Sequence, residues 1–535
     1  MPRQRIEAIG SIGLNTDVPP TLLPPQAVTT LRNVVTSDGA LRSGSAFKKL
    51  FNVLVEPRYT FQYKGANIDQ YLIVSDGIAV YAYSMQGVGE EITPTEGGWN
   101  GGRVTFCNHN TVLVVNSASD GAFYWPGPSS PLLPLPGWDT SWQCVEMASY
   151  KYFLVALGMT EGGTEYLQKL RWSNSAAEGE LPTAWTPTIF NDAGDDLVGE
   201  TAGAIVTSAL VRDQLAIVKT DALYSMNWIG GNNVMQVTRV AGGIGSRIPD
   251  GVAEWRGNLL IFSTDDLLLW DGQGVKSIVD RRVRNGIFDE VDPQYWDLSK
   301  LYVHYPSNRV LIGVVPAGQN RITAALIWDW EEDTWTVRDG ISHGYGFTEA
   351  VVNVTYDTLT WDGLETTPVP WGQSPAGAVP FWGVDKDWDS QDGSWNKNTY
   401  SPILPDLLVF ESNEANTEWW VSLTNVNSHD MSVSPISTQV ERVGLPIEGV
   451  DGFAQINAAW IEASGDQPFL FYVGAHDYPD EAPRWESPWT IVPGRPTQVT
   501  PRCTGRFIAW RIESNDRGVW EVSGITFDWQ RAGER

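Results

Sequence analysis

Residues 258–270 read NLLIFSTDDLLLW. The two halves of this run are almost entirely apolar, and a short polar stretch, Thr264-Asp265-Asp266, separates them. Short apolar runs on either side of a polar turn are typical of two β-strands that are covered on both faces and joined as a hairpin. We therefore expect an antiparallel hairpin between Asn258–Phe262 and Leu267–Trp270.

The same pattern recurs along the first two thirds of the chain. Apolar runs begin at residues 71, 111, 152, 214, 258 and 309, at intervals of 40 to 62 residues. One propeller blade takes roughly 40 to 50 residues. Most of these runs precede a polar turn and a second run that ends in an aromatic residue: Tyr81, Trp125, Trp228 or Trp270. The sequence thus predicts an all-β protein with an irregular β-propeller over residues 52–345, with a β-sandwich or β-helix as the alternative.

Three other segments flank the predicted propeller. Residues 1–51 are expected to form an extended N-terminal arm. Residues 346–433 have the character of an insertion or linker with additional strands, because Pro, Gly, Trp and Asp dominate much of this segment. Residues 434–535 contain strand-like runs with alternating polarity, such as Phe469–Val473, which predicts a C-terminal antiparallel β-sandwich-like domain.

The composition excludes several classes of protein. The chain has 535 residues with 64 acidic and 36 basic side chains, a net charge of −28, and no apolar stretch long enough to cross a bilayer. The N-terminus lacks the apolar core of a secretory signal, so we expect cytosolic synthesis. The three cysteines, Cys107, Cys144 and Cys503, are an odd number without CxxC spacing, so we expect no disulfide framework. Such an acidic surface should also repel nucleic acid, because duplex binding depends on basic groups.

No local motif points to catalysis. The chain lacks GxSxG, a phosphate-binding GxxxxGK[ST] and a strand-linked GxGxxG, so acyl transfer and nucleotide chemistry are not indicated. The five histidines share no metal-ligand spacing; they are His109, His304, His343, His429 and His476. We therefore predict no catalytic residue, no cofactor and no metal. The 26 tryptophans are interpreted as packing between blades rather than as carbohydrate platforms.

One acidic cluster has a spacing that resembles a calcium loop. Its four carboxylates are Asp385, Asp387, Asp389 and Asp392. An EF-hand loop needs a glycine at its sixth position and a bidentate glutamate at its twelfth, but Ser390 and Asn396 occupy those places. A solvated acidic loop is the favoured interpretation, and a long loop of this kind is also a candidate for a channel or interface.

Both ends of the chain resemble tail proteins of short-tailed bacteriophages. Residues 31–44 read LRNVVTSDGALRSG and resemble the opening of such proteins, which show an Asn, then Asp-Gly, then Arg-x-Gly. The C-terminal block is similar to a recurrent phage tail module. The similar segments there are residues 471–477, 505–514 and 520–525.

The resemblance is to the tail nozzle family, also called tail tubular protein B or packaged DNA stabilisation protein. It implies a structural virion protein, not an enzyme, that is assembled in the host cytoplasm. Its members form a homohexameric tube below the head-to-tail adaptor, and the genome is retained and ejected through the tube. The implied partners are the adaptor and a tail fibre, spike or needle, while DNA passes without specific binding and no membrane is entered. The competing hypothesis is a host-glycan-binding or glycan-degrading tail-associated β-propeller.

Overall fold

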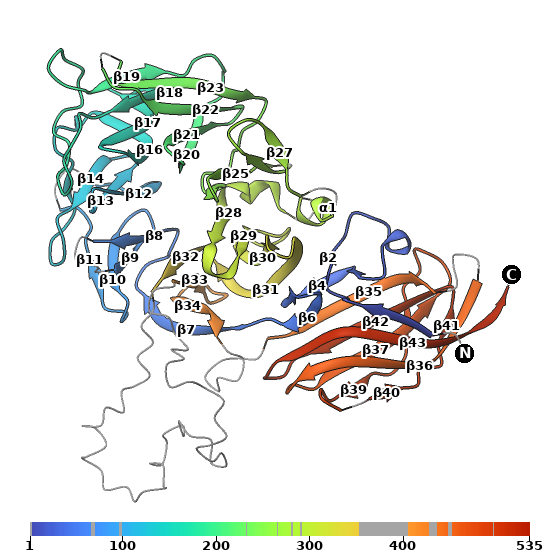
Figure 1. The fold of residues 1–535 in the computed structure, drawn as a ribbon. Helices are drawn as coiled ribbons and strands as arrows, with labels where there is room; N and C mark the ends of the chain where they lie inside the picture. Colours follow the sequence, from blue (N-terminus) through green and yellow to red (C-terminus); the bar gives the residue numbers. More distant parts are fainter. Residues whose placement is uncertain are drawn as a thin grey trace, which may run out of the picture.

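A computed structural model describes residues 3–534 except 66–69, 96–98, 232, 265, 280–281, 289–290, 352–404, 427–435, 448–451 and 496. The described chain forms a β-propeller and a two-sheet β-sandwich, which lie side by side in Figure 1. The predicted all-β fold class is confirmed. No described helix is long and apolar enough to cross a membrane.

The propeller has seven four-stranded antiparallel blades, of which six are separate sheets and one is part of a ten-stranded sheet. The first strand of each blade contacts the first strand of the next until β32 contacts β8. Blade 1 consists of β8 (Tyr59–Lys64), β9 (Gln70–Ser75), β10 (Val80–Ser84) and β11 (Gly89–Glu91). Blade 2 consists of β12 (Val104–His109), β13 (Val112–Ser117), β14 (Gly121–Trp125) and β15 (Leu133–Pro134). Blade 3 consists of β16 (Trp142–Tyr150), β17 (Phe153–Glu161), β18 (Thr164–Trp172) and β19 (Gly194–Leu197).

The remaining blades continue the same order around the ring. Blade 4 consists of β20 (Ile205–Val211), β21 (Gln214–Lys219), β22 (Ala222–Trp228) and β23 (Met235–Gly242), and blade 5 of β24 (Val252–Trp255), β25 (Asn258–Phe262), β26 (Leu267–Trp270) and β27 (Val275–Ser277). Blade 6 consists of β28 (Lys300–His304), β29 (Arg309–Val314), β30 (Ile322–Asp329) and β31 (Thr334–Gly344). Blade 7 consists of β32 (Gly346–Ala350), β33 (Asp406–Ser412), β34 (Trp419–Val426) and β7 (Ala46–Val53).

Each apolar run of the sequence is the second strand of a blade. The run at Asn258–Phe262 is β25, which pairs antiparallel with β26 as predicted. Leu260 and Phe262 are fully buried, because the sheet packs against neighbouring structure on both faces. The aromatic ends of the hairpins mostly pack inward, since Trp125 and Trp270 are at most 4% exposed. Trp228 is the exception at 45% exposure, with the Lys151 ammonium 5.1 Å from its ring centroid.

Blade 7 closes the ring with a strand from the N-terminal part of the chain. Strand β7 pairs with β34, with Val53 opposite Trp419. The propeller therefore begins before residue 52 and extends beyond the expected boundary at 345, because β33 and β34 belong to it. Local spacing could not indicate this, since the pairing joins segments more than 360 residues apart.

A buried carboxylate fastens this closure. Glu56 follows β7 and accepts hydrogen bonds from Arg58 Nε at 2.7 Å, Arg321 Nη2 at 2.5 Å and Tyr345 Oη at 3.1 Å. Burial acts to raise the pKa of Glu56, but the two arginines outweigh it and the pKa is lowered. Glu56 thereby ties the end of β7 to blade 6, which precedes β32 in the ring.

The sandwich is built from both ends of the chain. One sheet has the order β40-β36-β43-β6-β5, with β1 beside β43 and β41 beside β36. The other has the order β4-β35-β42-β37-β38, with β39 beside β37. This second sheet continues into blade 6 as one ten-stranded sheet, because Arg32 of β4 pairs in parallel with Val337 of β31. Their bounds are β1 (Arg3–Glu7), β4 (Thr30–Arg32), β5 (Val34–Ser37), β6 (Ala40–Ser43), β35 (Thr438–Pro446), β36 (Gly452–Gly465), β37 (Phe469–His476), β38 (Arg484–Trp485), β39 (Trp489–Ile491), β40 (Gln498–Val499), β41 (Thr504–Gly505), β42 (Phe507–Ser514) and β43 (Trp520–Glu534).

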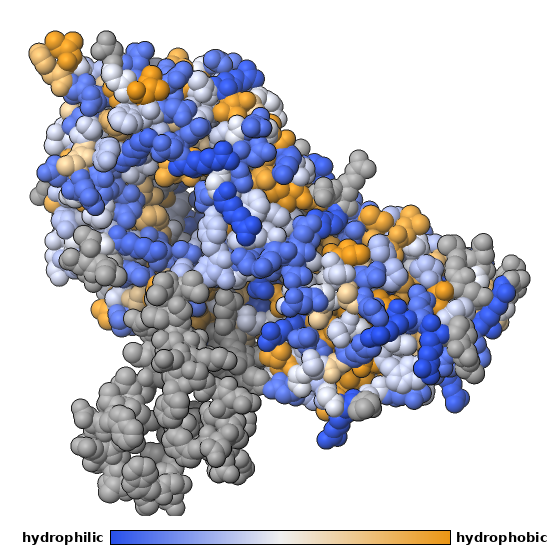
Figure 2. Space-filling model, viewed as in Figure 1, coloured by the Kyte–Doolittle hydropathy of each residue, from blue (hydrophilic) through white to orange (hydrophobic). Residues whose placement is uncertain are grey.

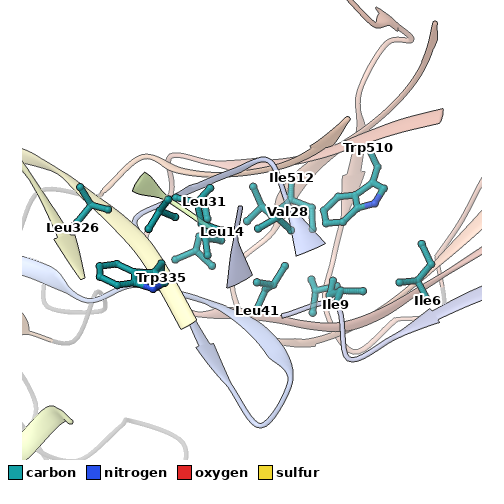
Figure 3. Packing of buried hydrophobic residues seen from close by; sticks show 14 of the residues in the cluster. Ile6, Ile9, Leu14, Val28, Leu31, Leu41, Leu326, Trp335, Trp510 and Ile512 are labelled. Carbon is teal, nitrogen blue, oxygen red and sulfur yellow. The ribbon is translucent and has the colours of Figure 1, made fainter. Parts of the chain in front are cut away.

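The expected extended arm is thus incorrect for residues 3–43. These residues pair with strands near the C-terminus, as where Ile6 lies opposite Ile525. A continuous apolar core joins them to the rest: in Figure 3, Leu31 and Leu41 lie between Trp335 of the propeller and Trp510 of the sandwich. Burial of this apolar surface holds the N-terminal strands in place.

Short elements complete the described chain. Strands β2 (Gly13–Leu14) and β3 (Ala27–Val28) form a small parallel pair. The helical turns are η1 (Pro20–Leu22), α1 (Arg284–Phe288), η2 (Pro293–Leu298) and η3 (Tyr305–Ser307).

Candidate functional site

A polar, partly open cavity of about 440 Å³ lies on the axis of the propeller. All seven first strands line it, and the surface is hollowed at the centre of the propeller in Figure 2. The first strand of each blade is an edge strand, so its unpaired N–H and C=O groups face the axis. Such groups require water or polar ligand atoms, which makes this cavity suited to a polar molecule.

An ion pair forms one part of the cavity wall. Lys300, at the start of β28, donates a hydrogen bond to Asp250, which precedes β24. Asp250 keeps 50% of its side-chain surface open to the cavity although protein surrounds the site. Burial acts to raise the pKa of Asp250, but the nearby Lys300 ammonium and Arg103 guanidinium outweigh it, and the pKa is lowered. Asp250 is therefore an anion whose charge Lys300 already balances.

A second carboxyl group, Glu146 of β16, faces the same cavity. Its Oε1 accepts hydrogen bonds from Ser208 N at 3.0 Å and Ser208 Oγ at 2.6 Å. Burial raises the pKa of Glu146, and neither Ser208 nor the Arg103 charge reverses that direction. Glu146 therefore carries its negative charge less readily than an exposed glutamate.

Tyr302 of β28 and Glu349 of β32 form a third pair in the wall. Burial raises the pKa of Tyr302, and the neighbouring Glu349 carboxylate adds to the shift. The phenol therefore stays protonated and donates its hydrogen bond to Glu349. This pair joins blade 6 to blade 7 across the cavity surface.

Arg103, the residue before β12, is the remaining charged group of the wall. Its charge acts on Glu146, Asp250 and Tyr59. No described residue forms a hydrogen bond or ion pair with its guanidinium, whereas Lys300 is paired with Asp250. The cavity thus combines satisfied acids with one guanidinium whose five donors are open.

These cavity residues were not predicted from the sequence. Arg103, Glu146, Asp250 and Lys300 each lie seven to nine residues before the second strand of their blade. A charged residue at that distance before an apolar run could have indicated the cavity, because it lies on or next to the first strand of the blade, which is the strand nearest the axis. The chain has 100 charged residues, so without the arrangement of the blades nothing distinguishes these four from the others.

A second structured region is the joint between propeller and sandwich, and residues 31–44 form it. Asn33 is 3% exposed and has a φ of 55°. Its Nδ2 donates to the carbonyl of Ser437 at 2.8 Å, and its Oδ1 accepts from the Asp339 amide at 3.0 Å. Ser437 precedes β35 of the sandwich, and Asp339 lies in β31 of the propeller, so one side chain bridges both domains.

The Asp-Gly part of the same run and the glycine of its Arg-x-Gly part also have structural roles. Asp38 and Gly39, with φ of 51° and 76°, form the two-residue turn between β5 and β6. Such a turn needs two residues with positive φ, which Asp-Gly provides. A Cβ at Gly44 would lie 2.7 Å from the carbonyl oxygen of Asn33. Arg42 is exposed.

A buried cation adds to the joint. Arg442 of β35 is fully buried, and its guanidinium donates to the carbonyls of Pro20 at 2.8 Å, Leu23 at 2.9 Å and Val443. Burial lowers the pKa of Arg442 to about 10. This side chain holds residues 20–23 against the sandwich, because buried carbonyls need donors.

The acidic residues predicted as a candidate channel or interface loop, Asp385, Asp387, Asp389 and Asp392, lie outside the described residues. Among the residues that are described, no group of three or more His, Cys, Asp or Glu converges to hold a metal. His109 and His304 are buried and hydrogen-bonded to Ser149 and Ser307. Cys107, Cys144 and Cys503 are free thiols.

The chain is an all-β protein that joins a seven-bladed propeller to a two-sheet sandwich. No family model and no curated protein matches it. Among solved structures, it is similar to a catalytically inactive virginiamycin B lyase from Staphylococcus aureus with quinupristin, at 7% identity and a TM-score of 0.33. That match covers 58% of this chain and 96% of the lyase chain.

Proposed function

We propose that this protein is a structural component of a short phage tail. In this proposal it forms a homohexameric nozzle below the head-to-tail adaptor, through which the genome is retained and ejected. The observation that carries the proposal is the role of residues 31–44, the run with the phage-tail resemblance. These residues are the joint between the two domains, with Asn33, Asp38-Gly39 and Gly44 each meeting a specific backbone requirement.

That role makes a chance resemblance less plausible. A common surface turn would tolerate many sequences. Here the side chain of Asn33 bridges the two domains, and there is no room for a side chain at position 44. The residue pattern therefore matches the requirements of this particular arrangement of propeller and sandwich. We infer that proteins with the same pattern join their domains in the same way.

The charge is consistent with a conduit for duplex DNA. Each chain carries −28, so six copies bring about 170 negative charges to the ring. Basic contacts to phosphate add salt-dependent attachments that ejection would have to break. An acidic wall lets DNA pass without specific binding, and the adaptor and a fibre, spike or needle would then dock on other faces.

The assembly state tests this proposal. Six subunits of 59.1 kDa give a particle of about 355 kDa. We expect negative-stain images of the purified full chain to show a hollow ring with six-fold symmetry, and mass photometry to give that mass. A monomer or an elongated trimer at micromolar concentration would refute the nozzle and favour the glycan-directed tail protein.

A further inference from the structure

We propose that Asn100 is a site of spontaneous deamidation, in which the Asn100–Gly101 unit closes to a succinimide and Asp120 takes up the proton. The inference concerns one chain and does not depend on the proposed tail function. Asn100 is exposed and lies between blades 1 and 2, shortly before β12. An asparagine followed by glycine is prone to this reaction, because glycine has no side chain to shield the attacking backbone nitrogen.

Both reacting groups of this dipeptide contact the carboxylate of Asp120, which lies in the turn between β13 and β14. Asn100 Nδ2 donates a hydrogen bond to Asp120 Oδ1 at 3.0 Å, and Gly101 N donates to Asp120 Oδ2 at 3.0 Å. Ser117 Oγ also donates to Oδ2, at 2.9 Å, and so orients the carboxylate. One carboxylate therefore holds the attacking nitrogen and the leaving amide side by side, which favours ring closure.

The same carboxylate lies where both proton transfers take place. Gly101 N forms a bond to Asn100 Cγ and gives its proton to Oδ2 of Asp120. The Cγ–Nδ2 bond then breaks, and the proton passes to the leaving nitrogen, so that ammonia departs and Asp120 is again a carboxylate. Water opens the five-membered ring to aspartate or isoaspartate. A positioned acid–base group accelerates steps of this kind.

The fold requires the glycine that makes this reaction possible. Gly101 has a φ of 96°, and a Cβ there would lie 2.7 Å from the carbonyl oxygen of Gly77 in blade 1. Gly102 N donates to the same carbonyl at 3.0 Å. Deamidation replaces the Asn100 donor by a carboxylate that faces Asp120, and the two negative charges repel. We therefore expect the reaction to weaken this contact between blades 1 and 2.

The chain contains one other Asn-Gly pair, Asn285–Gly286, which serves as an internal reference. Asn285 is also exposed, but it lies in α1, and ring closure requires its backbone to leave the helical conformation. The nearby carboxylate of Asp17 accepts from the amides of Arg284 and Asn285, at 2.8 and 2.9 Å. It is thus placed one residue too early to contact the attacking nitrogen of Gly286.

Peptide mapping of the full chain, with isoaspartate quantified at both sites, tests the proposal. After incubation at physiological pH and temperature, we expect Asn100 to convert at least fivefold faster than Asn285 in the folded chain. In the chain unfolded by urea, the two rates should agree within twofold, because only the local sequence then acts. Conversion of Asn285 as fast as Asn100 in the folded chain would overturn the proposal.

A variant pair tests the role of the carboxylate. Asp120→Ser should slow conversion of Asn100 at least fivefold. The matched control is Asp271→Ser, which removes a turn carboxylate that also precedes a glycine, in blade 5, and it should change nothing at Asn100. Hydrogen bonds that only immobilised the segment would protect Asn100, so their loss would speed the reaction. Unchanged or faster conversion in Asp120→Ser, with wild-type circular dichroism, would therefore also overturn the proposal.

The structural consequence has its own measurement. Asn100→Asp reproduces the added charge, whereas Asn100→Ser loses the same hydrogen bond without a charge. We expect a lower melting temperature for Asn100→Asp than for Asn100→Ser. Equal melting temperatures would refute charge repulsion as the effect of the modification.

Discussion

Replacing Arg442 with methionine should detach residues 20–23 from the sandwich without unfolding the propeller. The variant loses charged hydrogen bonds to the carbonyls of Pro20 and Leu23, each contributing roughly 1.5–3 kcal/mol. It also removes the cost of burying a cation. The lowering of the Arg442 pKa to about 10 corresponds to roughly 3 kcal/mol of that cost. The net loss is about 2 kcal/mol, because the hydrogen bonds outweigh the desolvation.

Hydrogen exchange measured by mass spectrometry localises this effect. The amides of Leu22, Leu23 and Ala27 donate to nearby carbonyls, and we expect them to exchange about 30-fold faster in Arg442→Met. That factor is the exchange equivalent of about 2 kcal/mol. The matched control is Arg495→Met, which alters an exposed arginine and should change nothing. Unchanged exchange at these three amides, or a more stable Arg442→Met, would refute the assignment of Arg442 as the anchor.

Three further perturbations have defined outcomes. The lowered pKa of Glu56 means that its stabilisation is present above its unfolded pKa of about 4.5 and is lost as pH falls through the folded value. Glu56→Gln should therefore flatten the fall in urea-unfolding free energy below pH 4.5, and an unchanged slope would exclude Glu56 as the closing group. Gly44→Ala should lower the melting temperature, at a cost of about 2 kcal/mol, because its Cβ meets the Asn33 carbonyl; an unchanged melting temperature would mean that the joint relaxes freely. Asp387→Asn combined with Asp389→Asn should change stability by less than about 0.5 kcal/mol. Thermal destabilisation by EDTA, reversed by calcium, would contradict the prediction that no metal is needed.

The local part of the fold could be predicted from the sequence. The hairpin of β25 and β26 follows from apolar runs around a polar turn, and its pairing is confirmed. The sandwich-like block likewise follows from alternation, as in β37. In both cases the pattern of apolar and polar residues that indicates the strands lies within about fifteen consecutive positions, so the local sequence is enough to predict them.

The long-range part could not be predicted in this way. Strand β7 has mostly intermediate burial, and nothing in its local pattern indicates its partner β34. The axial cavity depends on that closure, because Arg103, Glu146 and Asp250 come together only when seven blades form a ring. Sequence spacing reports a strand and its faces, but not which distant strand completes the sheet.

The pairing of β1 with β43 has a consequence for how the chain acquires its fold during synthesis. Residues 46–426 contain every strand of the propeller, so the ring can close while later residues are still being translated. Strands β1 and β6 are made early but pair with β43 only after that strand has left the ribosome. Until then their apolar side chains lack a core, and a chaperone that shields them would raise the yield of folded protein more than one acting on the finished propeller.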